Sequence, residues 1–188
     1  MKIYLKPLLI VLPIFILFLL VTYYYTSAQT AKVPTNIERL KTFETIGLPS
    51  FNYRTWAGSP ASFSEPSGQI VIINFWASWC APCIEEIPSL IKLVNKYQGK
   101  IKLIAVSGDS DKKDIEIFLK SFPDLINPNI DLVWDEDHSI MQKFGVERMP
   151  ESFVSKVNHR LAKKIIGTIN WYTPGSLEYV DGLFKDTK

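Results

Sequence analysis

The chain has 188 residues, of which 47% are hydrophobic and 21% are charged. This length and composition fit one globular domain with a short additional segment, and they exclude a disordered or fibrous protein. Setting aside Lys2 and Lys6 at the N-terminus leaves 19 of the 21 basic residues to balance 19 acidic ones. Because phosphate binding needs many basic side chains on one face, we expect no nucleic acid partner.

Residues 1–25 form a separate unit that we expect to be addressed to a membrane. Residues 7–25 carry no charge, and a helix of that length rises roughly 28 Å, close to the hydrocarbon thickness of a bilayer. We interpret the segment as one transmembrane signal-anchor helix. A cleavable signal peptide is the alternative, since Thr26, Ser27 and Ala28 are small enough for cleavage. In either case the two lysines stay in the cytoplasm, so the rest of the chain is expected on the extracytoplasmic (periplasmic) side.

The remainder divides into a polar tether, residues 26–47, and a folded domain, residues 48–188. Residues 48–68 are rich in Ser, Pro and Gly and indicate short extended pieces and turns. Alternating apolar patterns then predict strands and helices. In chain order these are strand 70–76, a helix from Cys80 to near Gly99, strand 101–106, helix 112–122, strand 130–134, helix 139–144, an antiparallel hairpin 152–157 and 161–166, and helix 176–184. A parallel β-α-β start with an antiparallel end predicts a mixed α/β sandwich.

The two cysteines, Cys80 and Cys83, are the only ones in the chain and lie three positions apart. One local pair excludes a scaffold of several disulfides. A structural zinc site would need two more ligands, but His138 and His159 lack metal-like spacing. An inert disulfide closing so short a ring would constrain little chain entropy. The pattern therefore favours redox chemistry over both alternatives.

The position of the pair supports this interpretation, because it lies where strand 70–76 gives way to a helix. A thiolate at Cys80 would face the unpaired N–H groups and positive dipole of the helix start. Thiols in such motifs have a pKa of roughly 3.5 to 7.5, compared with about 8.5 for free cysteine. We therefore expect Cys80 to attack and Cys83, one turn inside the helix, to resolve. Pro82 suits the first turn, where a missing N–H is tolerated.

Residues 74–83 resemble the active-site signature of the thioredoxin superfamily; they read Asn74-Phe75-Trp76-Ala77-Ser78-Trp79-Cys80-Ala81-Pro82-Cys83. With the export segment in front, the chain is similar to the membrane-tethered TlpA/ResA branch, which includes the CcmG/DsbE-like proteins of cytochrome c maturation. The resemblance runs from Leu48 to Trp171. It implies a thioredoxin fold with an N-terminal β-hairpin extension and a central insertion, and no cofactor beyond the redox-active disulfide.

A second landmark is the stretch 145–153, which resembles the family loop whose proline is cis and lies against the disulfide. Pro150 is the matching residue; without the resemblance, an ordinary trans turn would be expected. The resemblance further implies that Met149 backbone groups pair with an extended substrate and that Trp79 forms a wall facing it. The sequence Pro150-Glu151-Ser152 is similar to that of the cytochrome c maturation members. This resemblance makes Glu151 a further candidate for substrate binding.

The chain also departs from the family pattern. Asn74 stands where cytoplasmic thioredoxins have a buried, proton-shuttling Asp, and Asn cannot titrate. Glu86 lies three residues after Cys83 on the same helix face, where ResA-like proteins have an acid. A buried carboxylate there would have a raised pKa and take the proton from Cys83; the alternative is a solvated side chain like Glu85. Arg148 replaces a glycine that is common in the family, so the identity of the partner protein stays open.

We therefore expect a thiol-disulfide oxidoreductase that reduces disulfides of exported proteins such as apocytochrome c, supplied with electrons by a transmembrane thiol carrier. A general disulfide oxidase or isomerase is one alternative. A Cu(I)-handling metallochaperone using both cysteines is another, although such proteins usually space the cysteines wider and add a nearby histidine. A thiol peroxidase is a third alternative. Such enzymes carry a hydroxyl side chain three residues before the cysteine, and Ala77 at this position argues against that activity.

Overall fold

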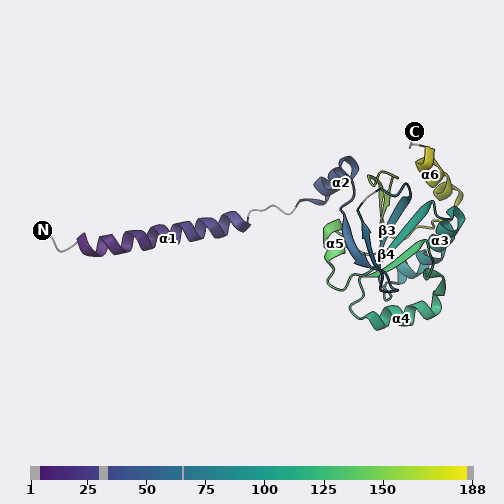
Figure 1. Cartoon of the computed structure of the whole chain (residues 1–188), viewed down its shortest axis with the longest axis horizontal. Helices are drawn as coiled ribbons and strands as arrows, with labels where there is room; N and C mark the ends of the chain where they lie inside the picture. The colour runs from purple at the N-terminus through teal and green to yellow at the C-terminus, as the bar shows by residue number, and fades with distance from the viewer. Residues whose placement is uncertain (1–4, 30–33, 65, 186–188) are drawn as a thin grey trace. The chain divides into compact units, whose positions relative to one another are not determined.

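The computed structural model describes residues 5–29, 34–64 and 66–185. The chain divides into two compact units, residues 1–35 and residues 36–188 (Figure 1). The first unit contains one helix, α1 (Leu5–Gln29), with Pro13 inside it. Within the described ranges, no helix meets the combined requirement of length and apolarity for crossing a bilayer. The membrane anchor therefore stays a prediction, and Lys2 lies outside the described residues.

The second unit is built on a five-stranded sheet in the order β5-β4-β3-β6-β7. The parallel part joins β3 (Ile70–Trp76), β4 (Ile101–Ser107) and β5 (Ile130–Trp134). The antiparallel part adds β6 (Glu151–Ser155) and β7 (Leu161–Ile166). Every residue of β3 is buried, as expected for a central strand covered on both faces.

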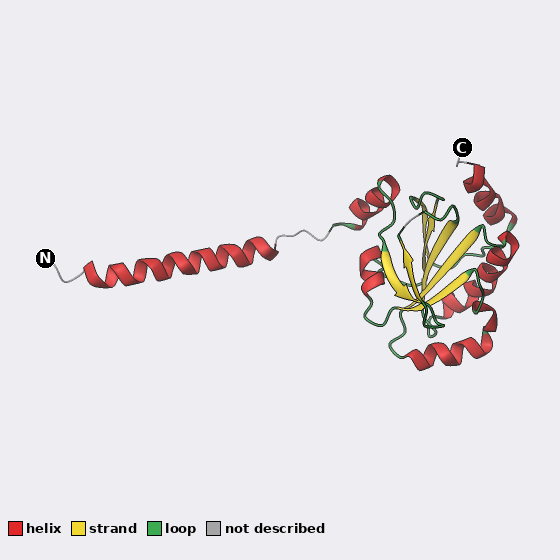
Figure 2. Ribbon diagram, viewed as in Figure 1, coloured by secondary structure: helices red, strands yellow, loops and turns green. Residues whose placement is uncertain are grey.

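Helices cover both faces of this sheet (Figure 2). They are α3 (Ala81–Tyr97), α4 (Lys112–Ser121), the 3-10 turn η1 (Pro123–Leu125), α5 (Ser139–Phe144) and α6 (Pro174–Lys185). Because side chains alternate along a strand, β3 contributes to two cores. Ile72 packs with residues of α3, α4 and α6, whereas Ile73 and Phe75 pack with Phe144 of α5. The predicted mixed α/β sandwich is confirmed.

The expected N-terminal hairpin is present in the fold. A hairpin of β1 (Phe51–Arg54) and β2 (Pro60–Phe63) precedes the sheet. Between β4 and α5, the chain forms α4, η1 and β5, and the central insertion implied by the family resemblance stays a prediction. The hairpin contributes Phe51 and Phe63 to the core on the α5 face.

The predicted tether differs from the structure in its second half. Residues Asn36–Thr45 form helix α2, and the second unit begins at Asn36 rather than at Leu48. Phe43 is buried, with its ring centroid 5.8 Å from that of Phe144 and 6.1 Å from that of Phe153. The sequence of this segment has only a short apolar pattern at Ile37, Leu40 and Phe43, which is too short to predict a helix by itself. Contacts with residues distant in sequence bury Phe43. Residues 30–33 of the predicted tether lie outside the described residues.

If α2 is part of the domain, Phe43→Ala should lower the free energy of unfolding by about 3 kcal/mol, since it leaves a cavity beside the rings of Phe144 and Phe153. Ile37→Ala on the same helix is the matched control, because Ile37 is 80% exposed, and it should change stability by less than about 0.5 kcal/mol. Guanidinium unfolding measures both. If the two substitutions changed the free energy of unfolding equally, α2 would not be a packed part of the domain.

Candidate redox-active site

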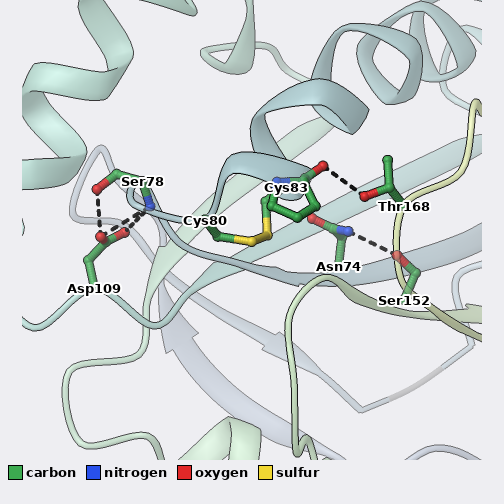
Figure 3. Close-up of a disulfide and its surroundings, with 8 residues drawn as sticks. Asn74, Ser78, Cys80, Cys83, Asp109, Ser152 and Thr168 are labelled. Carbon is green, nitrogen blue, oxygen red and sulfur yellow. Dashed lines mark hydrogen bonds between the residues drawn. A yellow bond between two sulfur atoms is a disulfide. The ribbon is translucent and has the colours of Figure 1, made fainter.

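The two cysteines form a disulfide where β3 passes into α3 (Figure 3). Cys80 is the N-terminal cap of α3, and the Cys83 N–H donates to the Cys80 carbonyl at 2.9 Å. The Cα atoms lie 5.3 Å apart. Cys80 keeps 6% of its surface exposed and Cys83 only 1%. The more accessible sulfur is therefore the one at the start of the helix, in agreement with an attacking Cys80 and a resolving Cys83.

The loop before Cys80 is held by Asp109, a residue that the sequence analysis missed. Its fully buried carboxylate accepts hydrogen bonds from the Ser78 N–H at 3.0 and 3.1 Å and from the Ser78 hydroxyl at 2.7 Å. The Ser107 hydroxyl donates to it at 2.6 Å. Asp109 lies two residues after the end of β4, which is parallel to β3. The carboxyl ends of neighbouring parallel strands lie at the same edge of a sheet. The positions of Ser78 and Asp109 after two predicted strands could therefore have indicated this contact.

The two tryptophans of the motif lie in opposite environments. Trp76 is buried, with its ring centroid 4.8 Å from that of Phe118 in α4. Trp79 is 67% exposed beside Cys80. A large exposed aromatic next to a reactive sulfur is available to contact a partner protein.

The peptide bond between Met149 and Pro150 is cis, as the family resemblance implied. The Pro150 carbonyl accepts the Gly167 N–H at 2.9 Å, and the Pro82 carbonyl accepts the Thr168 hydroxyl at 3.0 Å. Both prolines named from the sequence are thus bonded to adjacent residues that follow β7. Met149 is half-buried and packs against the cores on both faces of the sheet.

Glu151 lies in a different setting from the one expected of a substrate contact. Its side chain is buried in β6, and its Oε2 pairs with the Lys164 Nζ of β7 at 2.9 Å. Both charged groups are largely shielded from water. Removing one partner of such a buried pair destabilises the fold, because the other charge is left unpaired. The carboxylate is engaged within the sheet, so a role in substrate binding stays a prediction.

Asn74 and Glu86 both occupy the interior around the disulfide. The Asn74 Nδ2 donates to the Ser152 hydroxyl at 2.9 Å, which joins β3 to β6 (Figure 3). Glu86 is 2% exposed on α3, one turn beyond Cys83, whereas neighbouring Glu85 is exposed. The Trp171 indole N–H donates to Glu86 Oε1. The buried carboxylate predicted for Glu86 is confirmed, and the solvated alternative is wrong.

Burial raises the pKa of Glu86 from 4.5 to about 7, and the hydrogen bond from Trp171 partly opposes the rise. Removing water penalises the charged form, because a low-dielectric interior solvates a carboxylate poorly. A group with this pKa is present in both protonation states near neutral pH. It can therefore accept or give up a proton without a large free-energy penalty.

Comparison with known proteins decides the family. The sequence pattern of the family described as AhpC/TSA matches residues 47–164. The chain belongs to the AhpC/TSA family. It is 30% identical over 120 residues to the thiol-disulfide oxidoreductase ResA of Bacillus thuringiensis (strain Al Hakam), covering 63% of this chain and 67% of that one. It is 30% identical over 106 residues to the thioredoxin-like protein YneN of Bacillus subtilis (strain 168), covering 56% of this chain and 61% of that relative.

Solved structures agree with this assignment. A putative thiol:disulfide interchange protein DsbE from Chlorobium tepidum has a TM-score of 0.64 at 23% identity, covering 73% of this chain and 95% of that one. StoA from Bacillus subtilis has a TM-score of 0.57 at 26% identity, covering 70% and 96%. The first likeness shows the thioredoxin-like fold. Together with the ResA relative, these findings confirm this AhpC/TSA member as a thioredoxin-like thiol-disulfide oxidoreductase.

The two histidines of this AhpC/TSA protein are engaged outside the disulfide. The His138 Nε2 lies 3.3 Å from the Gly108 carbonyl, and the His159 ring stacks on Phe63 with centroids 4.2 Å apart. Over residues 5–29, 34–64 and 66–185, no three His, Cys, Asp or Glu side chains group closely enough to hold a metal ion.

The raised pKa of Glu86 predicts a pH-dependent stability. Glu86 titrates near 4.5 when unfolded and near 7 when folded, so the folded state binds more protons in this window. The free energy of unfolding should therefore fall as pH rises from about 4.5 to about 7, by roughly 3 kcal/mol in total. Glu86→Gln should abolish that fall, whereas Glu85→Gln should keep it. Chemical unfolding at pH 5 and pH 8 tests this, and identical pH profiles for Glu86→Gln and wild type would contradict it.

Proposed function

We propose that this domain reduces disulfides of exported proteins, with apocytochrome c as the favoured substrate. One observation carries the proposal: Cys80 and Cys83 form a single pair at the start of α3, with the buried carboxyl of Glu86 one turn behind Cys83. This arrangement combines an attacking sulfur, a resolving sulfur and a group able to move a proton near neutral pH.

The first step is attack by the Cys80 thiolate on a partner disulfide. A bond forms between Cys80 Sγ and one partner sulfur, the partner S–S bond breaks, and the second partner sulfur leaves as a thiolate that takes a proton from water. The start of α3 favours the anionic form of Cys80. Its 6% exposure limits attack to a partner that docks closely over the sulfur.

The second step releases the partner. Glu86 accepts the Cys83 proton, and the Cys83 thiolate attacks Cys80 Sγ, which closes the intramolecular disulfide and expels the remaining partner sulfur. The partner has gained two electrons and the protein has lost two. Residues three apart on a helix are neighbours on one face, so Cys83 and Glu86 are within reach of direct or water-mediated transfer.

Two features support docking of an extended partner segment. Trp79 is 67% exposed next to Cys80, and the cis bond before Pro150 shapes the chain around Met149. In the proposed complex, the backbone of Met149 pairs with the partner, and Pro82 and Trp79 line the approach to the sulfur. Glu151, which is paired with Lys164, contributes through the shape of β6.

The direction and location follow from chemistry. Exported compartments are oxidising, so a reductant there needs electrons delivered from the cytoplasm. We therefore propose a transmembrane thiol carrier as donor, and attachment of the domain to the cytoplasmic membrane by the N-terminal helix, with the catalytic domain on the periplasmic side. The family resemblance favours the haem-site thiols of apocytochrome c as substrate.

Cys83→Ala should trap the partner, because Cys80 still attacks while the resolving thiol is absent. The variant chain, isolated from its own cells, should carry a protein joined to Cys80 by a disulfide, and mass spectrometry should identify an apocytochrome c. Cys80→Ala is the matched control and should trap nothing. Alkylation in cells should find the wild-type pair mainly reduced.

The alternatives give different results in the same experiment. A Cu(I) metallochaperone predicts no trapped protein, and a disulfide oxidase predicts a wild-type pair that is mainly oxidised in cells. Failure of Cys83→Ala to capture any protein would contradict the proposed reductase.

A further inference from the structure

The connection between β7 and α6, residues 167–173, is bonded to both sides of the redox site. We call it the 167–173 strap. At one end, Gly167 and Thr168 bond to the carbonyls of Pro150 and Pro82, at 2.9 and 3.0 Å. Gly167 has φ +85°, a backbone conformation that favours glycine. The strap therefore links the cis-proline loop to the first turn of α3.

Further along the strap, Trp171 is fixed at both its backbone and its ring. Its backbone N–H donates to the Ser89 hydroxyl at 3.0 Å, and that hydroxyl donates to the Glu86 carbonyl at 2.8 Å. Its indole N–H donates to Glu86 Oε1, and the side chain is 2% exposed. An indole only donates hydrogen bonds. Trp171 can therefore hold the carboxyl oxygen but cannot take its proton.

The two oxygens of Glu86 are consequently unequal. Oε1 is occupied by the indole, whereas the buried Oε2 has no hydrogen-bond partner among the residues that the structure describes. A buried carboxyl oxygen without a partner is costly for a purely structural side chain. It is, however, the arrangement needed by an oxygen that receives a proton from a neighbouring thiol during a reaction.

We propose that Trp171 is a positioning residue that holds Glu86 Oε1, so that Oε2 exchanges the proton with Cys83. This inference rests on the proposed function and names a residue outside the cysteine motif and the proline loop. It makes the 167–173 strap part of the resolving step. Trp171 acts through Glu86 and does not itself touch the reacting sulfurs.

The indole N–H also affects the pKa of Glu86. Its N–H stabilises the charged form and lowers the pKa of Glu86, against the larger raising effect of burial. No charged neighbour contributes to the shift in that pKa. The titratable groups on the two helices and the strap are Cys83, Glu85, Lys92, Lys96 and Tyr97 on α3, Tyr172 on the strap, and Glu178, Tyr179, Asp181 and Lys185 on α6. Removing the indole donor should therefore raise the pKa of Glu86.

The test uses the full chain in detergent, reduced and then mixed with 5,5′-dithiobis(2-nitrobenzoate). Cys80 attack releases the first thionitrobenzoate, and Cys83 closure releases the second, so the two steps are seen separately. Trp171→Phe keeps an aromatic ring but removes the N–H. The pH midpoint of the second phase should rise by about one unit, and its rate at pH 7 should fall about five- to ten-fold. The first phase should stay within about two-fold.

Tyr172→Phe is the matched control on the same strap, and both of its phases should equal those of wild type. A purely structural role for Trp171 would change unfolding and both phases together without moving the pH midpoint. A folded Trp171→Phe chain whose second phase keeps the wild-type midpoint would overturn the proposal.

If Trp171→Phe does not fold, the wild-type chain labelled with 15N-tryptophan provides the answer. The Trp171 indole resonance should move with the same pH midpoint as the second phase, and a resonance insensitive to pH would overturn the proposal. Glu86→Gln separates the two levels of the argument. If the second phase of Glu86→Gln equals that of wild type, Glu86 has no role in the resolving step and neither has Trp171. The disulfide exchange activity itself would not be contradicted by that result. Absence of both phases in wild type contradicts the proposed function itself.

Discussion

The redox site depends on one constraint, which is that a sulfur is held at the point where a buried strand becomes a helix. β3 is buried along its whole length, so its carboxyl end is fixed by the two cores of the domain. Ser78, bonded to Asp109, fixes the next loop, and Cys80 then begins α3. The backbone therefore fixes the position of this sulfur at the N-terminus of α3.

The titratable carboxyl near the disulfide lies on the helix rather than on the strand. Asn74 in β3 is buried and bonded to Ser152, and it cannot titrate. Glu86 in α3 is equally buried and has a pKa of about 7. The carboxyl is thus on the same element as the resolving cysteine, and any movement of α3 carries both groups together. The buried acid costs stability above neutral pH, a penalty that a purely structural residue would not justify.

Much of this arrangement follows from local sequence. β3 was predicted within its observed bounds because a continuous β-branched run is buried in any central strand, and the cysteine pair was recognisable by its place after that run. Other parts depend on partners distant in sequence. Ser78 meets Asp109 across 31 positions, and Glu86 meets Trp171 across 85. The shared edge of two parallel strands points to the first pair, whereas no local pattern marks the second. Helix α2 escaped prediction for the same reason, since Phe43 is buried among residues distant in sequence, including Phe144 of α5 and Phe153 of β6.

The most direct test of the central claim is the pH dependence of alkylation at Cys80 in the reduced chain. Iodoacetamide labelling followed by peptide mass spectrometry reports the thiolate fraction of each cysteine separately. The account predicts that the pKa of Cys80 lies clearly below the value of about 8.5 for a free thiol, and that the same sulfur exchanges with disulfides. A Cys80 thiol that titrates like free cysteine and exchanges with no disulfide would contradict the account.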